Sequence, residues 1–274
     1  MLIMPWTSRH LEWMEDTGEK ILTVCGHQAP IYRFNHNIFD DEIMMSWVKH
    51  FRNHYCSDND LYFLKDPKVN RNDYLVKIKF PDVKERPGPS IRAGDFAEIL
   101  VADYLQYLHQ YYVPRTRYDR KVVRNESSKG SDVIAFRQES QSPSKKDELL
   151  VYEVKALLSE KKTANILQTA INHSKKDELR IAESLNAIRQ RLYDKNDYDG
   201  MQVISRFQNL VDNPYQMSYG AAAVISESSY KPEELAKADT SGHPFNNELS
   251  LLVIYGKELM PLVHTLYERA ANEA

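Results

Sequence analysis

The spacing of apolar residues along the chain predicts a mixed α/β protein. Apolar side chains three or four positions apart form one face of a helix, whereas short apolar or alternating runs are typical of strands. Helical spacing occurs at residues 40–56, 94–112, 163–193 and 257–271. Strand patterns occur at residues 20–25, 29–34, 73–80, 115–125, 131–137, 148–158, 219–226 and 249–256.

The order of these elements is most regular after residue 93. A helix, three strands, a second helix and a further strand give an α-β-β-β-α-β core. A polar, exposed loop is expected at 228–248, before a last strand and helix. Alternation of this kind predicts a mixed sheet with helices on its faces.

The stretch at residues 80–94, punctuated by Pro81, Pro87, Gly88 and Pro89, predicts a boundary in the chain. We place an N-terminal α+β region at 1–88 and the main domain at 89–274. The aromatic helix of the first region, with Trp47 and Phe51, is by default ordinary core. Alternatively it docks a partner, and we expect the region to regulate or present the main domain.

Composition and charge exclude several classes of protein. A net charge of −3 argues against a generally basic nucleic-acid coat, so an anionic ligand requires a local basic patch. Two cysteines, Cys25 and Cys56, are too few for a disulfide framework. The first residues are too charged for a signal peptide, and no apolar run approaches the roughly 20 residues that span a bilayer. We expect a soluble, cytoplasmic protein.

The strand at 148–158 carries an unusual pair of charges. Glu153 and Lys155 follow a largely apolar run and, being two residues apart, project to the same face. In a dry core they would cost several kcal/mol each without partners. A cleft at that end of the strand explains them better, although an internal salt bridge without catalysis is the alternative.

Two further carboxylates fit the same site. If 131–137 and 148–156 pair as a hairpin, Asp132 lies near Glu153 and Lys155. Glu98 lies close to the apolar face of the preceding helix, and Asp95, one turn earlier, is the alternative. Carboxylates that converge repel unless a cation separates them. Mg²⁺ or Mn²⁺ is the usual solution, and we expect no small-molecule cofactor.

Glu98, "SDVIAF" with Asp132, and "YEVK" with Glu153 and Lys155 resemble the PD-(D/E)xK nuclease superfamily over residues 90–226. The resemblance implies a restriction-endonuclease-like fold. It also implies that Asp132, Glu153 and the carbonyl of Val154 bind the metal, with Glu98 as an auxiliary ligand. Lys155 would orient or activate the attacking water. The sequence departs from the motif in having Ser131, not proline, before Asp132.

Three stretches resemble more closely HamA, the nuclease subunit of Hachiman anti-phage defence. They are "HFRNHYC" with "DLYFLKD", "GDFAEILVADYL", and "RNESSKGSDVIAF" with "LLVYEVKALLS". This resemblance implies a superfamily 2 helicase partner, HamB-like, that holds the nuclease inactive until DNA is damaged or invaded. Release would then allow broad DNA degradation by endonuclease or exonuclease cleavage and abortive infection.

A basic segment precedes the proposed metal site and is a candidate DNA-binding groove. An edge strand whose charges prevent aggregation is the alternative, at nearly even odds. Its cations are Arg115, Arg117, Arg120, Lys121, Arg124 and Lys129.

Gln168 lies in the helix after the proposed catalytic strand, where nucleases of this fold use a Gln or Tyr to assist the site. A surface glutamine is the simpler interpretation. His50 and His54, spaced i,i+4, allow a zinc site with Cys25, His27 or Cys56, but histidines on a helix surface are the simpler expectation.

Two other functions remain open. The chain could be an inactive nuclease fold that serves as the docking subunit of a helicase complex. It could also be a stand-alone DNA-repair or restriction nuclease. The residues do not distinguish DNA from RNA, or the preference for strand and sequence.

Overall fold

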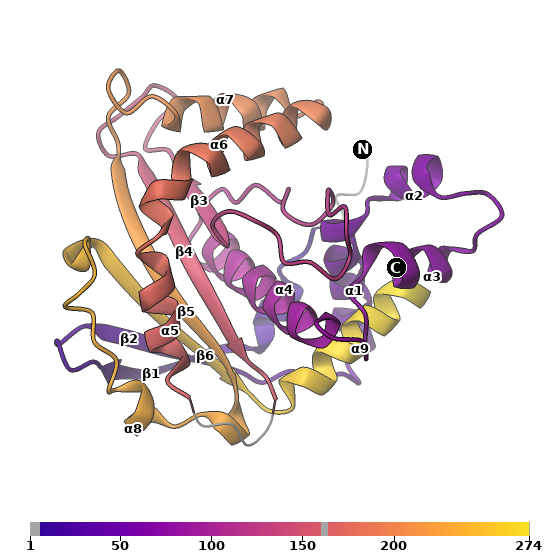
Figure 1. Ribbon diagram of the computed structural model, residues 1–274, viewed down its shortest axis with the longest axis horizontal. Helices are drawn as coiled ribbons and strands as arrows, with labels where there is room; N and C mark the ends of the chain where they lie inside the picture. Colours follow the sequence, from indigo (N-terminus) through magenta and orange to yellow (C-terminus); the bar gives the residue numbers. More distant parts are fainter. Residues whose placement is uncertain (1–5, 160–163, 274) are drawn as a thin grey trace.

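The computed structural model describes residues 6–159 and 164–273. Within them the strands form one six-stranded mixed sheet (Figure 1). Its order across the sheet is β1 (Met14–Leu22), β2 (Gln28–Phe34), β6 (Leu249–Gly256), β5 (Gln216–Ser226), β4 (Glu148–Leu157) and β3 (Val133–Arg137). β1–β2 and β3–β4 are antiparallel, and the other neighbours are parallel. The predicted mixed sheet is confirmed.

Helices cover both faces of the sheet, as predicted. One core layer packs α1 (Asp41–Tyr55), α4 (Gly88–Asp103) and α9 (Leu259–Asn272) against the sheet. The other layer contains α5 (Ile166–Ser174), α6 (Asp177–Asp194) and α7 (Tyr198–Phe207). Shorter helices are α2 (Asp58–Leu64), α3 (Arg71–Tyr74) and α8 (Pro232–Leu235).

Side chains of β4 alternate between these two layers. Leu150 and Tyr152 enter the layer with α4, whereas Leu149 and Val151 enter the layer with α5. This alternation follows from the period of two in a strand. It also sends Glu153 toward His173 of α5, just beyond the last pair of the β3–β4 ladder.

The N-terminal residues belong to the same sheet as the rest of the chain. β2 pairs with β6 in parallel, and Ile31 faces Val253. α1 packs against α9 in a shared core. Strands from both sides of the predicted boundary at residue 88 therefore form one sheet. A separate role for residues 1–88 stays a prediction.

Two predicted strands are wrong. Residues 73–80 form part of α3 and then a π-helical turn, Leu75–Lys79. The side chain of Asn70 caps this helix by accepting a hydrogen bond from the backbone of Asp73, a start signal that outweighed the short alternating pattern. Residues 115–125 are irregular, because their charges are paired with carboxylates of α4 and its surroundings and do not line a sheet edge.

The predicted helices are right in position but differ in extent. The helix expected at 94–112 begins at Gly88, is α-helical to Asp103, and continues as a π-helical turn, Tyr104–Leu108. The helix expected at 163–193 is divided at Lys175 and Lys176 into α5 and α6, and its first residue lies outside the described part. α7, capped by Asp197, was not predicted. No helix in the described part of the chain is long and apolar enough to cross a membrane.

Candidate active site

The start of β3 and the middle of β4 bring Asp132 and Glu153 together. The ladder between these strands, continued one residue beyond Val133, places Asp132 opposite Glu153. The Oδ2 atom of Asp132 accepts a hydrogen bond from the backbone N–H of Val154 at 2.9 Å. This bond fixes the carboxylate of Asp132 against β4.

Lys155 joins this pair from the same face of β4. Its Nζ atom forms an ion pair with Glu153 and donates a hydrogen bond to the carbonyl of Val154 at 3.2 Å. The same atom lies 3.8 Å from Oδ2 of Asp132. One ammonium group therefore contacts both carboxylates and the carbonyl between Glu153 and Lys155.

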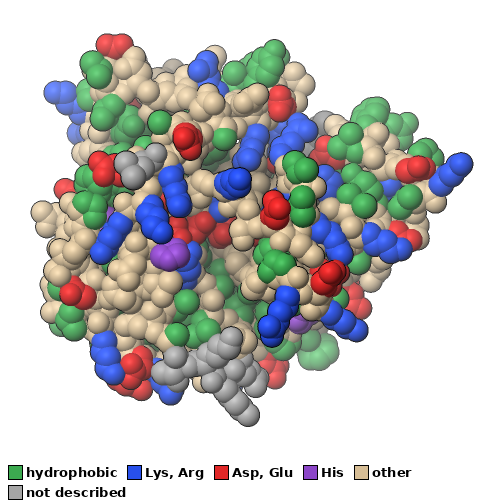
Figure 2. Space-filling view, in the orientation of Figure 1, with side chains coloured by type: hydrophobic (Ala, Val, Ile, Leu, Met, Phe, Trp, Pro, Cys, Tyr) green, Lys and Arg blue, Asp and Glu red, His purple; other side chains and the backbone are tan. Residues whose placement is uncertain are grey.

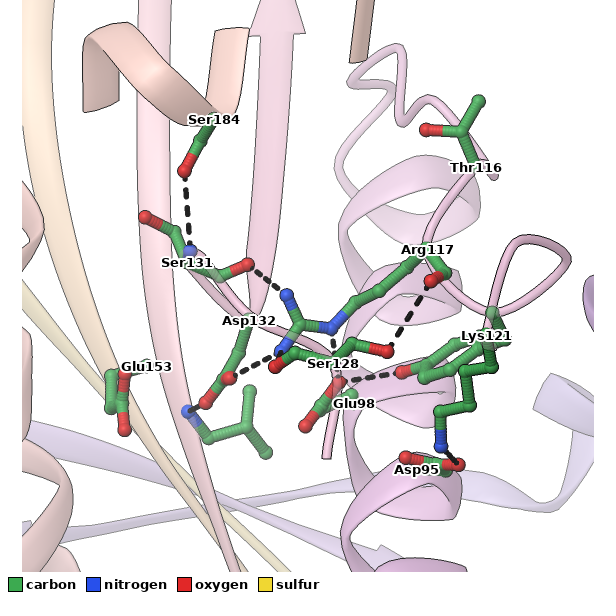
Figure 3. A network of polar contacts seen from close by, with 12 residues as sticks. Asp95, Glu98, Thr116, Arg117, Lys121, Ser128, Ser131, Asp132, Glu153 and Ser184 are labelled. Atoms are coloured by element: carbon green, nitrogen blue, oxygen red, sulfur yellow. Dashed lines mark hydrogen bonds and ion pairs between the residues drawn. The ribbon is translucent and has the colours of Figure 1, made fainter. Parts of the chain in front are cut away.

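Glu98 reaches the site from α4, on the other side of Asp132 from Glu153 (Figure 3). It does so through Arg117. The guanidinium of Arg117 donates from Nε to Oε2 of Glu98 at 2.6 Å and from Nη2 to Oδ1 of Asp132 at 2.8 Å. The hydroxyl of Tyr118 also donates to Glu98, at 2.6 Å. The structure thus brings all four predicted carboxylate and lysine side chains into one network, with Arg117 as an added member.

Two carboxylates in this network, Glu153 and Glu98, have raised pKa values. Burial and, to a smaller extent, the nearby charge of Asp132 raise the pKa of Glu153 to about 7, against the opposing effect of Lys155. Burial likewise raises the pKa of Glu98 to about 8, against the opposing effect of Arg117. For Lys155, burial opposes the charge, but Asp132 and Glu153 hold its pKa above the ordinary value. The site therefore favours additional positive charge.

The donor set fits a hard divalent cation. Asp132 and Glu153 offer carboxylate oxygens, and Val154 offers a backbone carbonyl beside them. Oxygen ligands of this kind suit Mg²⁺ and Mn²⁺. A bound cation would also stabilise the ionised form of Glu153, whose pKa is raised by burial and then by the charge of Asp132.

The sequence patterns did not identify two residues that lie near the site. His173, in the last turn of α5, has its Nδ1 atom 3.5 Å from Oε1 of Glu153. Asp177, the first residue of α6, is fully buried, and burial raises its pKa to about 6. Neither of its oxygens has a hydrogen-bond partner of ordinary geometry. The available signal was an acidic residue four positions after a histidine. The single long helix predicted at 163–193 hid the turn between α5 and α6, after which Asp177 lies close to Ser131 and Asp132.

Figure 2 shows this face of the molecule hollowed at its centre, with acidic side chains in the hollow, a histidine beside them and lysines and arginines on both sides. Lys155, Lys176 and Arg180 are close enough to His173 to lower its pKa, after the larger effect of burial. The basic residues thus surround the carboxylates without filling the hollow.

Most cations predicted to bind DNA are engaged by carboxylates. Arg115 contacts Asp103, Arg117 contacts Glu98 and Asp132, Lys121 contacts Asp95, and Arg124 contacts Asp82. Arg120, which is half exposed, lies 3.8 Å from Asp194. Lys129 is exposed and lines a cavity together with Glu98, Arg117 and Asp132.

Gln168 makes structural hydrogen bonds away from the carboxylates. Its Oε1 atom accepts from the backbone N–H of Asp239 at 2.6 Å, and its Nε2 atom donates to the carbonyl of Asp239 at 3.1 Å and to Asn172. These bonds join α5 to the loop after α8. The side chain is occupied there, and His173 is the residue of α5 that contacts Glu153.

His50 and His54 are buried, so the expectation of surface histidines is wrong. His10 and His50 contact Asp103, whose Oδ2 atom lies 2.9 Å from His10 and 3.1 Å from His50, and His54 lies beside His50. These two histidines and Asp103 offer ligand atoms within 4.8 Å of one another. Arg115, 2.5 Å from Asp103, already supplies a cation.

Three further contacts argue against zinc in this cluster. The guanidinium of Arg115 lies 2.9 Å from Nε2 of His54. The backbone N–H of Thr7 donates to Nδ1 of His50, which places the proton of neutral His50 on Nε2 and makes that atom a donor to Asp103. The thiol of Cys25 donates a hydrogen bond to Asp239, which is not a member of this cluster.

The model of the HamA family matches residues 9–270 of this 274-residue chain. No curated protein matches it significantly. The matched span includes all six strands and every residue of the network around Asp132. The chain therefore belongs to the HamA family, and its role is in Hachiman-related anti-phage defence.

Proposed function

We propose that the protein is a metal-dependent nuclease of the PD-(D/E)xK type that hydrolyses phosphodiester bonds in DNA. The observation that carries this proposal is the hydrogen bond from the backbone of Val154 to Asp132. It holds two carboxylates, a carbonyl and Lys155 within a few ångströms at one edge of the sheet. Phosphodiester hydrolysis requires an aligned water and a neutralised phosphate. The two carboxylates, the carbonyl and Lys155 could together meet both requirements.

Each residue has a distinct part in the proposed reaction. Asp132, Glu153 and the carbonyl of Val154 would hold Mg²⁺ or Mn²⁺, which supplies Lewis acidity toward the phosphate when bound. Burial lowers the pKa of Lys155, but the neighbouring carboxylates outweigh this effect and hold the pKa above its ordinary value, which favours the protonated form. As a cation, Lys155 would orient the attacking water and stabilise negative charge on the phosphate.

The charges on the surface support a nucleic-acid substrate, and we propose that it is DNA. Arginine and lysine side chains lie on both sides of the hollow that contains the carboxylates (Figure 2). Cations at such positions contact backbone phosphates without regard to sequence. Lys129, Lys176 and Arg180 are exposed near the site and can make these contacts.

Family membership supports a partner that controls the activity. We propose that a superfamily 2 helicase, HamB-like, restrains the nuclease in the cytoplasm and releases it when invading or damaged DNA is met. Broad cleavage would then end in abortive infection.

The experiment is cleavage of plasmid and linear DNA by the purified chain, with Mg²⁺ or with EDTA. The Glu153→Ala/Lys155→Ala variant should be inactive. Its matched control, Glu268→Ala/Lys257→Ala, changes the same residue types at exposed positions and should stay active. Cleavage that persists in EDTA, or in the first variant, would contradict the proposal. A folded chain that binds the helicase but never cleaves would identify the docking subunit.

A further inference from the structure

The side chain of Arg117 lies between two carboxylates that come from different elements of the fold (Figure 3). Glu98 belongs to α4, whereas Asp132 leads into β3. Arg117 contacts Glu98 at 2.6 Å and Asp132 at 2.8 Å. The gap between these carboxylates, where a bridging metal ion would be expected, therefore already contains a positive charge.

The guanidinium is held on every side. Besides the two carboxylates, it donates from Nη1 to the carbonyl of Ser131 and from Nη2 to the carbonyl of Ser128 at 3.3 Å. Its side chain is only 15% exposed. Planar, multidentate binding of this kind is the strong form of an ion pair. An arginine so engaged has few donors left for a DNA phosphate.

The contacts of Glu98 also point away from a role as a metal ligand. Its Oε2 atom accepts from both Arg117 and Tyr118. Asp132, by contrast, directs Oδ2 toward β4, where Val154 and Lys155 lie. Asp132 thus has two different neighbours: Arg117 lies on the side of Glu98, and Val154 and Lys155 lie on the side of Glu153.

We propose that Arg117 is a built-in cation that takes the place of a second metal ion between Glu98 and Asp132. The site then binds one divalent cation, on the Glu153 side of Asp132, and Glu98 acts as a positioning residue for Arg117. This inference rests on the proposed metal dependence of the site. It changes the role of Glu98 from auxiliary ligand to support for an internal ion pair.

The two carboxylates beside Arg117 support the same conclusion. The side chains of Glu98 and Asp132 are only 13% and 12% exposed, and both pair with Arg117. Removal of Arg117 leaves these two carboxylates facing an empty gap, which is unfavourable without a cation. A divalent ion would then occupy the gap and replace the two ion pairs that Arg117 now makes.

Mn²⁺ titration of the full chain, followed by electron paramagnetic resonance and calorimetry, tests the inference. We expect about one ion per wild-type chain and about two per Arg117→Met chain. The Arg117→Met/Glu98→Gln double variant should return to about one. Arg124→Met removes an arginine paired with Asp82 outside the site and should stay at about one.

Thermal unfolding supplies a second readout. In EDTA, Arg117→Met should melt well below the wild type, and Mg²⁺ should raise its midpoint more than that of the wild type or of Arg124→Met. Arg117→Lys keeps one positive charge and should bind one ion, as the wild type does. If the methionine variant does not fold, two ions in the lysine variant would contradict the proposed role of the charge.

Two ions in the wild type, or a folded Arg117→Met chain that still binds one, would overturn this inference and leave the nuclease proposal intact. A wild-type chain that binds no Mn²⁺ would overturn both.

Discussion

Asp132 and Val154 are joined by a hydrogen bond of 2.9 Å from the backbone of β4 to a carboxylate at the start of β3. Residues 22 positions apart in the chain are thereby locked in register at the edge of the sheet. The bond leaves Oδ1 of Asp132 for Arg117. It is the structural basis for grouping Asp132, Glu153 and Lys155 in one site, and several predictions rest on that grouping.

Replacement of Lys155 should separate metal binding from catalysis. Lys155→Met removes the ammonium group that pairs with Glu153, which leaves this carboxylate free to bind metal. Mn²⁺ should therefore bind at least as tightly as in the wild type. Cleavage should fall roughly 100- to 1,000-fold, because the charge that orients water and stabilises the phosphate is lost. Calorimetry and single-turnover cleavage measure the two effects, and a variant that loses both together would argue against this role.

Metal binding should depend on pH through Glu153. Its pKa in the folded protein is about 7, so the carboxylate is increasingly available as pH rises through that value. Mn²⁺ affinity should therefore increase between pH 6 and 8. The increase should be absent in Glu153→Gln, whereas an unchanged slope in that variant would assign the titration to another group.

The same shift has a consequence for stability. The pKa of Glu153 is higher in the folded chain than the value of about 4.3 for an unfolded glutamate. The folded state then binds the proton more tightly, so without divalent metal the free energy of unfolding should fall as pH rises from about 4.3 to about 7. Thermal melts in EDTA measure this fall, and saturating Mg²⁺ should reduce it.

Gln168 provides a test of a role expected from its position in the chain. Its side chain bonds to the backbone of Asp239, so Gln168→Ala should cost about 1 kcal/mol in the free energy of unfolding. The rate of DNA cleavage should remain within about twofold of the wild type. A large loss of cleavage in a stable variant would restore Gln168 to the catalytic machinery.

A buried ion pair away from the site should matter for folding alone. Arg206 of α7 pairs with Asp147 and donates to the carbonyls of Ser140, Gln141 and Ser142, which fixes the loop between β3 and β4. Arg206→Ala should lower the free energy of unfolding by about 3–5 kcal/mol, since it leaves Asp147 buried and unpaired. Urea denaturation measures this loss, and Mn²⁺ stoichiometry in the folded fraction should not change.

Local patterns in the sequence were sufficient for much of the sheet and for part of the site. The alternation of apolar residues identified β4, and two charges on one face of it marked the edge where Glu153 and Lys155 lie. The pairing of neighbouring strands then placed Asp132. These inferences succeed because they depend on contacts between segments close together in the chain.

The role of Arg117 lay beyond such reasoning. An arginine-rich segment looks the same whether its charges face solvent or carboxylates, and only the packing of residues 115–125 over α4 decides between them. The turn between α5 and α6 was hidden for a similar reason, because Lys175 and Lys176 fit the middle of a helix as well as its end. Long-range electrostatics and a tertiary break determined both outcomes.

The most direct test of the central claim is anomalous diffraction from crystals of the chain grown with Mn²⁺. The account predicts one strong peak within coordination distance of Asp132, Glu153 and the carbonyl of Val154. A map without density at that position, or with its main peak between Glu98 and Asp132 or beside His10 and Asp103, would contradict it.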